Sequence, residues 1–290
     1  MQSATQSAAD ARASAQSRIR LELLANLVRK DLKVKYKNST LGFVWSMANP
    51  LLYLAVFTLV FQFFLKSGVP KFAVYLMSGL LVWNFFNTAT MGATGSVVGS
   101  ANLVKKVRFP RVVLPLASVG FAGVHFALQM LVFFLFLIPF YPHAYGPQLW
   151  LLLPAVAVAV LFTVGMSLLV SGLNVRYRDV EHLLEIAMLA WFWLTPIVYS
   201  VGLVRKHLEA RGLFWLYVAN PMTSVVSAMQ RAIYRDPVKQ IGGVPTQVLA
   251  AGGYGFYLKW LGIAALVSAA LIAVGLWTFQ RLQADFAEEL

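Results

Sequence analysis

The stretch RKDLKVKYKNSTLG, Arg29–Gly42, decides the fold, because it places dense positive charge directly before a long apolar run. Five of its first nine residues are lysine or arginine, and the run VWSMANPLLYLAVFTLVFQFFL begins at Val44. Apolar runs longer than about 18 residues are typical of membrane-spanning helices, and flanking positive charge is typical of their cytoplasmic side. The stretch therefore predicts a membrane protein whose N-terminal region lies in the cytoplasm.

The composition of the whole chain supports this interpretation. Of its 290 residues, 59% are hydrophobic and only 12% are charged, whereas soluble domains hold about 45–50% apolar and about 25% charged residues. The formal net charge of +13 follows the positive-inside rule, and the repeated apolar runs argue against a nucleic-acid-binding protein. The chain contains no cysteine, which excludes disulfides, thiolate nucleophiles and cysteine-bound metals.

The predicted fold is an all-α integral membrane protein with six spans, because lipid offers no partner for unpaired backbone groups. The spans are expected at 44–65, 72–98, 112–141, 148–173, 183–201 and 257–279. Lysine and arginine in the short loops favour both termini in the cytoplasm. Residues 1–17, rich in Ala, Ser and Gln, lack an apolar core and are predicted to be a disordered cytoplasmic tail, so 18–290 form the transmembrane domain.

Residues 19–37 are predicted to form an amphipathic helix lying in the membrane interface. Leu21, Leu24, Val28 and Leu32 recur at three- and four-residue steps, and the cations lie mostly off that face. The alternative is a simple topology anchor, which needs positive charge but no apolar periodicity. Gly42 is then expected to let the backbone turn into the first span.

The cytoplasmic loop between the second and third spans is also patterned. Apolar and basic residues alternate over Leu103–Phe109, and Pro110 limits a short helix to about Phe109. A short amphipathic helix suits docking into a groove of a partner. An ordinary positively charged loop explains the pattern equally well.

The long external segment before the last span is predicted to hold two short re-entrant helices at about 210–235. Pro221 interrupts its apolar run, and Thr223 or Ser224 is expected to cap the second helix. A pair of full spans is the alternative. The glycine-rich residues that follow, 241–255, are expected to form a flexible loop.

Catalytic, metal-binding and cofactor motifs are absent from the sequence. There is no G-x-x-x-x-G-K-[ST] phosphate loop and no H-E-x-x-H motif. The chain is therefore not expected to be an enzyme, to hold a metal or to hydrolyse ATP itself. His125, the one histidine within a predicted span, is expected to bond a neighbouring helix.

Acidic residues give little support to an ion-coupled carrier or a glycosyltransferase. Glu185 is the one carboxylate near the depth of a span, and it is expected to pair with Arg176 or Arg178 at the interface. A membrane glycosyltransferase would need a positioned external acid. Glu209 is expected to pair with Arg205 or Arg211 instead.

What remains is a passive conduit that needs an outside energy source, and aromatic side chains are its most specific candidate lining. Aromatic rings stack on the C–H faces of sugars without charge, although ordinary packing is the simpler explanation from composition alone. One helical stripe of rings runs from Tyr53 to Phe64. The candidate lining residues are Tyr53, Phe57, Phe61, Trp83, Trp191, Trp193 and Tyr199.

Four segments, in order, resemble the membrane subunits of polysaccharide-exporting ABC transporters, the ABC type-2 permeases. They are RKDLKVKYKNSTLGFVWSMANPLLYLAVFTLVF, ANLVKKVRFPRVVLPLASV, LNVRYRDVEHLLEIAMLAWFWLTPIVYS and NPMTSVVSAMQRAIY. The resemblance covers about residues 20–290. It implies a subunit that moves a lipid-linked polysaccharide, of O-antigen, teichoic acid or cell-wall galactan type, across the bacterial inner membrane. An ABC permease for a drug or small lipid is the nearest alternative.

The resemblance also implies partners and residue roles. A second copy of the chain and two cytoplasmic ATPase subunits, which carry ATP and magnesium, would complete the exporter. Guiding of the lipid pyrophosphate falls to Arg29, Lys30, Lys33 and Lys35. Coupling to the ATPase falls to the helix at about 99–110, with Asn102, Lys105, Lys106, Arg108, Phe109 and Pro110. The external gate is shaped by Asn220, Pro221 and Met222.

Overall fold

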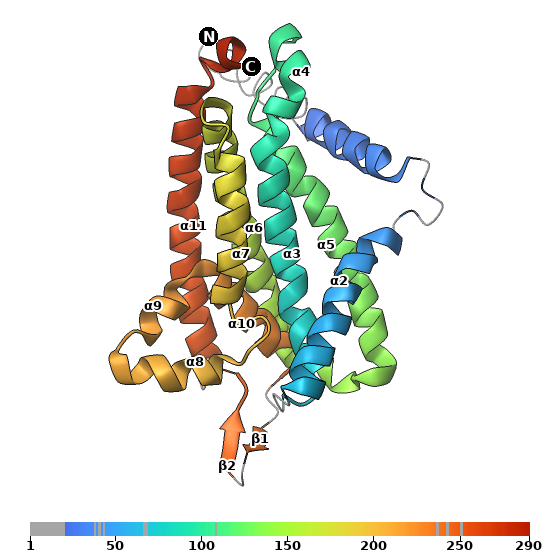
Figure 1. Cartoon of the computed structure of the whole chain (residues 1–290), viewed down its shortest axis with the longest axis vertical. Helices are drawn as coiled ribbons and strands as arrows, with labels where there is room; N and C mark the ends of the chain where they lie inside the picture. Colours follow the sequence, from blue (N-terminus) through green and yellow to red (C-terminus); the bar gives the residue numbers. More distant parts are fainter. Residues whose placement is uncertain are drawn as a thin grey trace, which may run out of the picture.

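The computed structural model describes residues 21–37, 39, 42, 44–65, 69–107, 109–235, 238–241, 244–249 and 252–290. These residues form an elongated helical bundle with one short β-hairpin at an end (Figure 1). An N-terminal helix covers 21–36. The long helices that follow are α2 (Val44–Phe57), α3 (Phe72–Ser96), α5 (Val113–Phe140), α6 (Leu152–Arg176), α7 (Val180–Leu194) and α11 (Tyr254–Leu282).

Shorter elements connect the long helices. The π-helical segment η1 (Thr58–Phe64) prolongs α2, and four 3₁₀ turns are η2 (Val98–Ser100), η3 (Pro142–Ala144), η4 (Pro147–Leu151) and η5 (Glu209–Arg211). The short helices are α4 (Ala101–Lys106), α8 (Val201–Leu208), α9 (Phe214–Ala219), α10 (Pro221–Ile233) and α12 (Phe286–Glu289). Figure 1 shows α4 and α12 at one end of the bundle and α8, α9 and the hairpin at the other.

Five helical segments among the described residues are long and apolar enough to cross a membrane. They are Met47–Phe64, Phe72–Ser96, Val113–Phe140, Pro147–Arg176 and Tyr254–Leu282, and each overlaps one of the predicted spans. The predicted span at 183–201 is not among them, because α7 has only 15 residues. The helix stops at Thr195, which is extended, as expected for the residue before Pro196.

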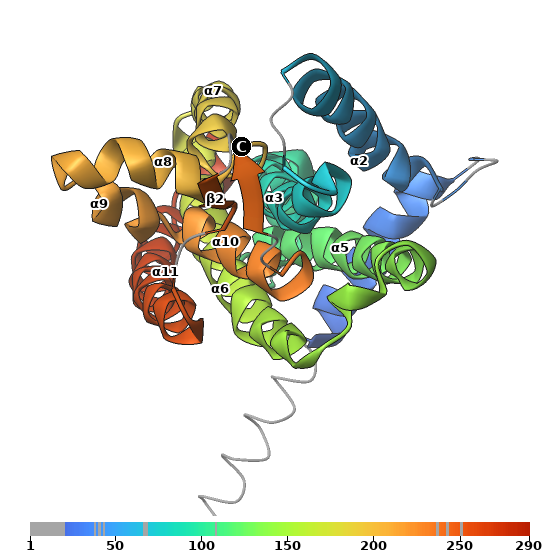
Figure 2. The same cartoon turned by 90° about the horizontal axis from the view of Figure 1, so that it is seen from below.

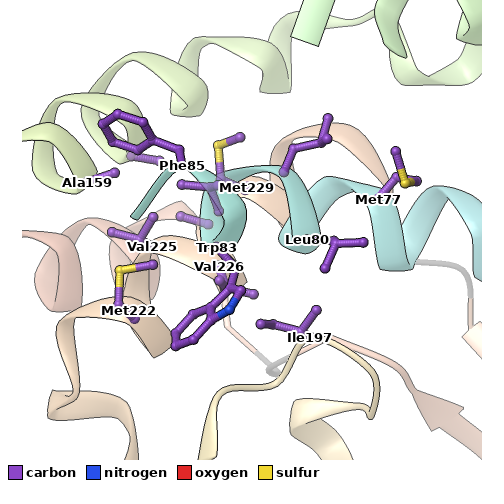
Figure 3. Packing of buried hydrophobic residues seen from close by; sticks show 14 of the residues in the cluster. Met77, Leu80, Trp83, Phe85, Ala159, Ile197, Met222, Val225, Val226 and Met229 are labelled. Atoms are coloured by element: carbon purple, nitrogen blue, oxygen red, sulfur yellow. The ribbon is translucent and has the colours of Figure 1, made fainter. Parts of the chain in front are cut away.

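Helix α3 is the centre of the bundle. Figure 2 shows it surrounded by α2, α5, α6, α7 and α10, and it contacts each of them. The ring of Phe86 is fully buried and lies 5.4 Å from the ring centroids of Phe162 and Trp191. Helix α10 also packs closely on α3, because a Cβ atom added at Gly79 would lie 2.9 Å from the Val226 side chain. Figure 3 shows this part of the core, with Leu80 and Trp83 of α3 and Met222, Val225, Val226 and Met229 of α10 among its buried side chains.

Helices α6 and α11 pack together more closely than side chains would allow. A Cβ atom added at Gly165 would lie 2.9 Å from the backbone nitrogen of Ile272, and one added at Gly275 would lie 2.8 Å from the carbonyl oxygen of Gly165. These glycines therefore bring two apolar helices into backbone contact, which is the usual use of small residues between membrane helices.

The segment before the last span, which was predicted to be external, differs from the prediction in two ways. Within 238–249, which was predicted to be partly a flexible loop, strands β1 (Val238–Ile241) and β2 (Val244–Gln247) pair antiparallel, with Val238 opposite Gln247. The α10 cap is also different. Asn220, not Thr223 or Ser224, caps the helix by accepting a hydrogen bond from the Met222 amide at 3.1 Å, because Pro221 occupies the first helical position.

Candidate functional site

A cavity of about 560 Å³ lies between α2, α3, α5 and α7. Each of these helices contributes side chains, and Lys35 of the N-terminal helix closes one side. Its lining combines aromatic and aliphatic side chains with amide, hydroxyl and imidazole groups and with one charge of each sign. Its shape depends on α3, because the buried helix fixes one wall.

The aromatic wall joins α2 to α7. The ring of Phe57 lies 5.7 Å from the ring of Tyr53, 5.9 Å from Phe192 and 6.3 Å from Trp193. Trp83 extends the wall from α3 and lies 5.8 Å from Phe192. Ring pairs at these separations contribute about 0.5–1.5 kcal/mol beyond burial. The exposed fractions of Tyr53 and Trp193 are 40% and 49%, so both rings keep free surface for a ligand.

A polar band lies within the same cavity. Its members can both donate and accept hydrogen bonds, and they come from three helices: Asn49, Asn84, Asn87, Thr88, His125 and Gln129. Polar side chains at this depth are costly in lipid and mark functional surfaces. Uncharged groups of this kind suit a ligand rich in hydroxyl groups. The sequence prediction missed the amides, although Asn and Gln inside apolar spans were the available signal.

The N-terminal helix is attached to α5 beside the cavity. The Tyr36 hydroxyl bonds Nε2 of His125, which confirms that this histidine bonds a neighbouring helix, while Nδ1 lies 2.9 Å from the carbonyl oxygen of Phe121. Val28 packs onto α5 at Gly120, which has no side chain to obstruct it. These contacts fix the position of the N-terminal helix along α5 and therefore the part of the cavity that Lys35 reaches.

Charges mark the cavity rim. The ammonium of Lys35 lies 5.2 Å from the ring centroid of Phe121, and partial burial lowers the pKa of Lys35. Lys35 is exposed at the surface of its helix, as are the other predicted guiding residues, Arg29, Lys30 and Lys33. Glu185 of α7 also lines the cavity, and Oε2 of its carboxylate lies 3.9 Å from Nδ1 of His182. The predicted pairing of Glu185 with Arg176 or Arg178 is therefore wrong.

Only part of the predicted aromatic set faces this cavity. Tyr53, Phe57, Trp83 and Trp193 line it. Phe61 packs on Phe72 at 5.9 Å. The remaining predicted residues are tied elsewhere: Trp191 donates a hydrogen bond from Nε1 to Asn220 Oδ1 at 3.1 Å, and the Tyr199 hydroxyl donates to the carbonyl oxygen of Trp193 at 2.7 Å.

The predicted coupling residues lie on and after α4. The helix ends at Lys106 rather than near Phe109, because Val107 is extended. Three of the residues are exposed on α4: Asn102, Lys105 and Lys106. Phe109 is half-buried and Pro110 is exposed, and Arg108 lies outside the described residues.

The predicted gate residues form the start of α10. Pro221 and Met222 are buried, and the cap residue Asn220 accepts hydrogen bonds from both Met222 and Trp191. The hydroxyl of Ser224, which was predicted as a cap, donates to the carbonyl oxygen of Val218 at 2.7 Å. The first turn of α10 is thereby linked to α7.

The described residues show no metal-binding geometry. No group of three or more histidine or acidic side chains there is arranged to hold an ion.

Comparison with known proteins gives consistent matches. Residues 22–234 match the family described as ABC-2 type transporter. An O-antigen export system permease protein RfbA of Klebsiella pneumoniae is 31% identical over 274 residues, which is 93% of this chain and 95% of that protein. A protein of the same name from Myxococcus xanthus is 29% identical over 272 residues, covering 92% and 95%. The family match includes the N-terminal helix, the cavity and α10.

Proposed function

The chain belongs to the ABC-2 type transporter family, and on that premise we propose that it is the transmembrane subunit of an ATP-driven exporter of a lipid-linked polysaccharide. The polysaccharide would be of O-antigen, teichoic acid or cell-wall galactan type. The observation that carries this proposal is the near full-length similarity to proteins named O-antigen export system permeases. The subunit would lie in the bacterial cytoplasmic membrane with both termini in the cytoplasm.

We infer that α7 supplies a sixth crossing together with the residues after it. A helix of 15 residues rises about 22 Å at 1.5 Å per residue, which is shorter than the hydrocarbon core of about 30 Å. The chain from Thr195 to Ser200 would complete the passage. Non-helical backbone is tolerated there when protein covers it, and Tyr75 supports this by donating to the Tyr199 carbonyl at 2.6 Å.

The cavity is the proposed entry path for the substrate. Lys35 would meet the pyrophosphate, with Arg29, Lys30 and Lys33 attracting it along the exposed face of the N-terminal helix. The amides would exchange hydrogen bonds with sugar hydroxyl groups, and Tyr53, Phe57, Trp83 and Trp193 would stack on sugar faces. Phe61, Trp191 and Tyr199 would support this wall from behind.

The driving force would come from two ATPase subunits bound to two copies of this chain. The contact would be α4, whose exposed cations suit an acidic groove, together with Phe109 and Pro110. ATP binding can shift only states that the two interfaces distinguish. Asn220, Pro221 and Met222 would set the position of the external gate at the other end of α7 and α10.

The test is transport by the purified complex in proteoliposomes that contain lipid-linked polysaccharide. We expect ATP-dependent movement of the glycan across the bilayer, measured by its accessibility to an added glycosidase, and no movement when the ATPase subunit is omitted. Movement of a drug or short lipid without the glycan would favour the drug or small-lipid permease instead. Polymer growth by this chain without the ATPase would favour the glycosyltransferase.

The glycosyltransferase alternative has little structural support. Its external acid would be Glu209, but this carboxylate accepts hydrogen bonds from Arg205 at 2.9 and 2.8 Å, as the sequence predicted. The other external acid, Asp236, lies outside the described residues. A carboxylate engaged with a guanidinium is a poor general base, because the pairing lowers its pKa.

A further inference from the structure

A second apolar cluster, separate from the main core, lies at the end of the bundle that carries α4 and α12. We call it the end cluster; its buried members are Val97, Val104, Leu114, Val175, Phe279 and Phe286. Val104 comes from α4 and Phe286 from α12. The exposed fractions of Val104 and Phe286 are 4% and 1%, so each short helix places one apolar side chain fully inside this cluster.

Neither short helix is stable by itself. Helix α4 has six residues and α12 has four, whereas isolated helices shorter than about 12–15 residues are marginal in water. The direction in which α4 points is therefore set by what it packs against. Helices α4 and α12 contact each other directly, and Leu103 and Leu290 pack on the margin of the end cluster.

Arg111 adds a polar connection between the same two regions. Its guanidinium donates a hydrogen bond to the carbonyl oxygen of Gln283 and lies 5.9 Å from the ring centroid of Phe286. The edge of that ring meets Phe279 at 5.3 Å. Arg111 follows α4 in the chain, so the loop that carries α4 is held on the C-terminal segment both through Val104 and through Arg111.

We propose that Phe286 and Arg111 are positioning residues for coupling: they hold α4 in the orientation in which it transmits movement between the ATPase and the spans. The inference rests on the proposed function, because it takes α4 as the ATPase contact. Lys105 and Lys106 are exposed on α4 while Val104 points inward. Without the Phe286 side chain, α4 would change its orientation when the ATPase moves against it, and the movement would not reach the spans.

The first test measures the position of α4 without any transport. Because the chain contains no cysteine, Lys105→Cys carries a single spin label on α4, and Leu216→Cys carries one on α9 as a reference. We expect Phe286→Ala to increase label mobility at position 105 and to leave it unchanged at position 216. Unchanged mobility at 105 overturns the proposal, as does an equal increase at both positions, which indicates general unfolding.

The second test measures coupling in the assembled exporter. We expect Phe286→Ala and Arg111→Gln to lower the glycan moved per ATP hydrolysed about fivefold, at the low end of typical coupling between sites, with the complex still assembled. Phe286→Leu keeps an apolar side chain and removes the ring, so it should fold and lose less. The proposal is overturned if all three variants move as much glycan per ATP hydrolysed as the unchanged complex does.

A matched control is available on the same end of α11. Arg281 lies 4.2 Å from the ring centroid of Trp277, a second cation–π pair whose two residues are not members of the end cluster. Trp277→Ala should leave both label mobility and the glycan per ATP unchanged; a loss equal to that of Phe286→Ala overturns the proposal. Absence of glycan movement in the unchanged complex would overturn the proposed function, while the mobility test would still decide the positioning role.

Discussion

Helices α2 and α3 are neighbours in the chain and are similarly apolar, but the protein uses them in opposite ways. In an 18-residue window, 78% of the α3 segment is buried and only 11% of the segment formed by α2 and η1. Most of the surface of helix α3 is covered by other helices of the same chain. Most of the surface of α2 and η1 is left uncovered by this chain. An apolar sequence therefore identifies a membrane-spanning helix. The buried fraction of that helix tells whether its side chains mainly stabilise the fold or remain available for binding.

The largest effect on stability should come from replacing a phenylalanine by alanine in α3, and the same replacement in η1 provides the comparison. Phe86→Ala removes a fully buried ring of α3 and should destabilise the protein by about 3–5 kcal/mol, as is usual for Phe→Ala in a core. Phe63→Ala removes a ring of η1 that is 66% exposed and should change stability little. Unfolding of the detergent-solubilised subunit measures both. Equal losses would remove the distinction between the two helices.

The exposed face of α2 should matter for transport instead. Tyr53→Ala and Trp193→Ala each remove one stacking surface, worth about 0.5–1.5 kcal/mol, so export should fall roughly two- to tenfold with assembly intact. Trp215→Ala is the control, because this ring of α9 is also exposed and lies outside the cavity. Polymer flux in proteoliposomes is the measurement. Unchanged flux in both cavity variants would eliminate the aromatic path.

A smaller effect is expected where a cation enters the space between α2 and α3. Lys35→Gln should raise the KM for lipid-linked glycan up to about tenfold, equal to about 1.4 kcal/mol of binding, whereas Lys37→Gln should not. Since burial lowers the pKa of Lys35, its charge is lost at lower pH than that of an exposed lysine. Flux should therefore decline at alkaline pH, and Lys35→Arg should move that decline to higher pH. Identical KM values for the Lys35→Gln and Lys37→Gln variants would contradict this role.

The smallest effect is expected at Glu209, which belongs to neither helix. Its pair with Arg205 lowers the pKa of Glu209, so any stabilisation is present above the unfolded carboxyl pKa and is lost as pH falls through the lowered value. Because the pair is exposed, solvent screening leaves little of it. Glu209→Gln should leave both Tm and flux unchanged. Loss of polymer synthesis in this variant would instead support the glycosyltransferase.

Much of the helical framework could be predicted from the sequence, because long apolar runs have few other uses. Five segments agree with predicted spans, and the turn before the first span agrees at Gly42, whose φ of +48° favours glycine. The stripe on α2 was only partly right. The π-helical turns of η1 change the helical register, and Phe64, which ideal spacing puts on the stripe, is 73% exposed.

The errors in the prediction have local physical causes. The hairpin was missed although Gly-Gly between two short β-prone segments, 238–241 and 244–247, is a known hairpin signal. The prediction placed the cap after Pro221, whereas proline is favoured at the first position of a helix and so leaves the cap to the residue before it, Asn220. The amides of the cavity could not be grouped, because Asn49, Asn87 and Gln129 are distant in sequence and meet only once three helices are packed.

The backbone contact between Gly165 on α6 and Gly275 on α11 has a consequence for how the shape of the protein can change. Two helices that touch without intervening side chains leave no room to slide or tilt past each other. We therefore expect this pair to act as the stationary frame of each transport cycle. The moving helices would then be α2 and α7, which contact the rest of the bundle through aromatic side chains.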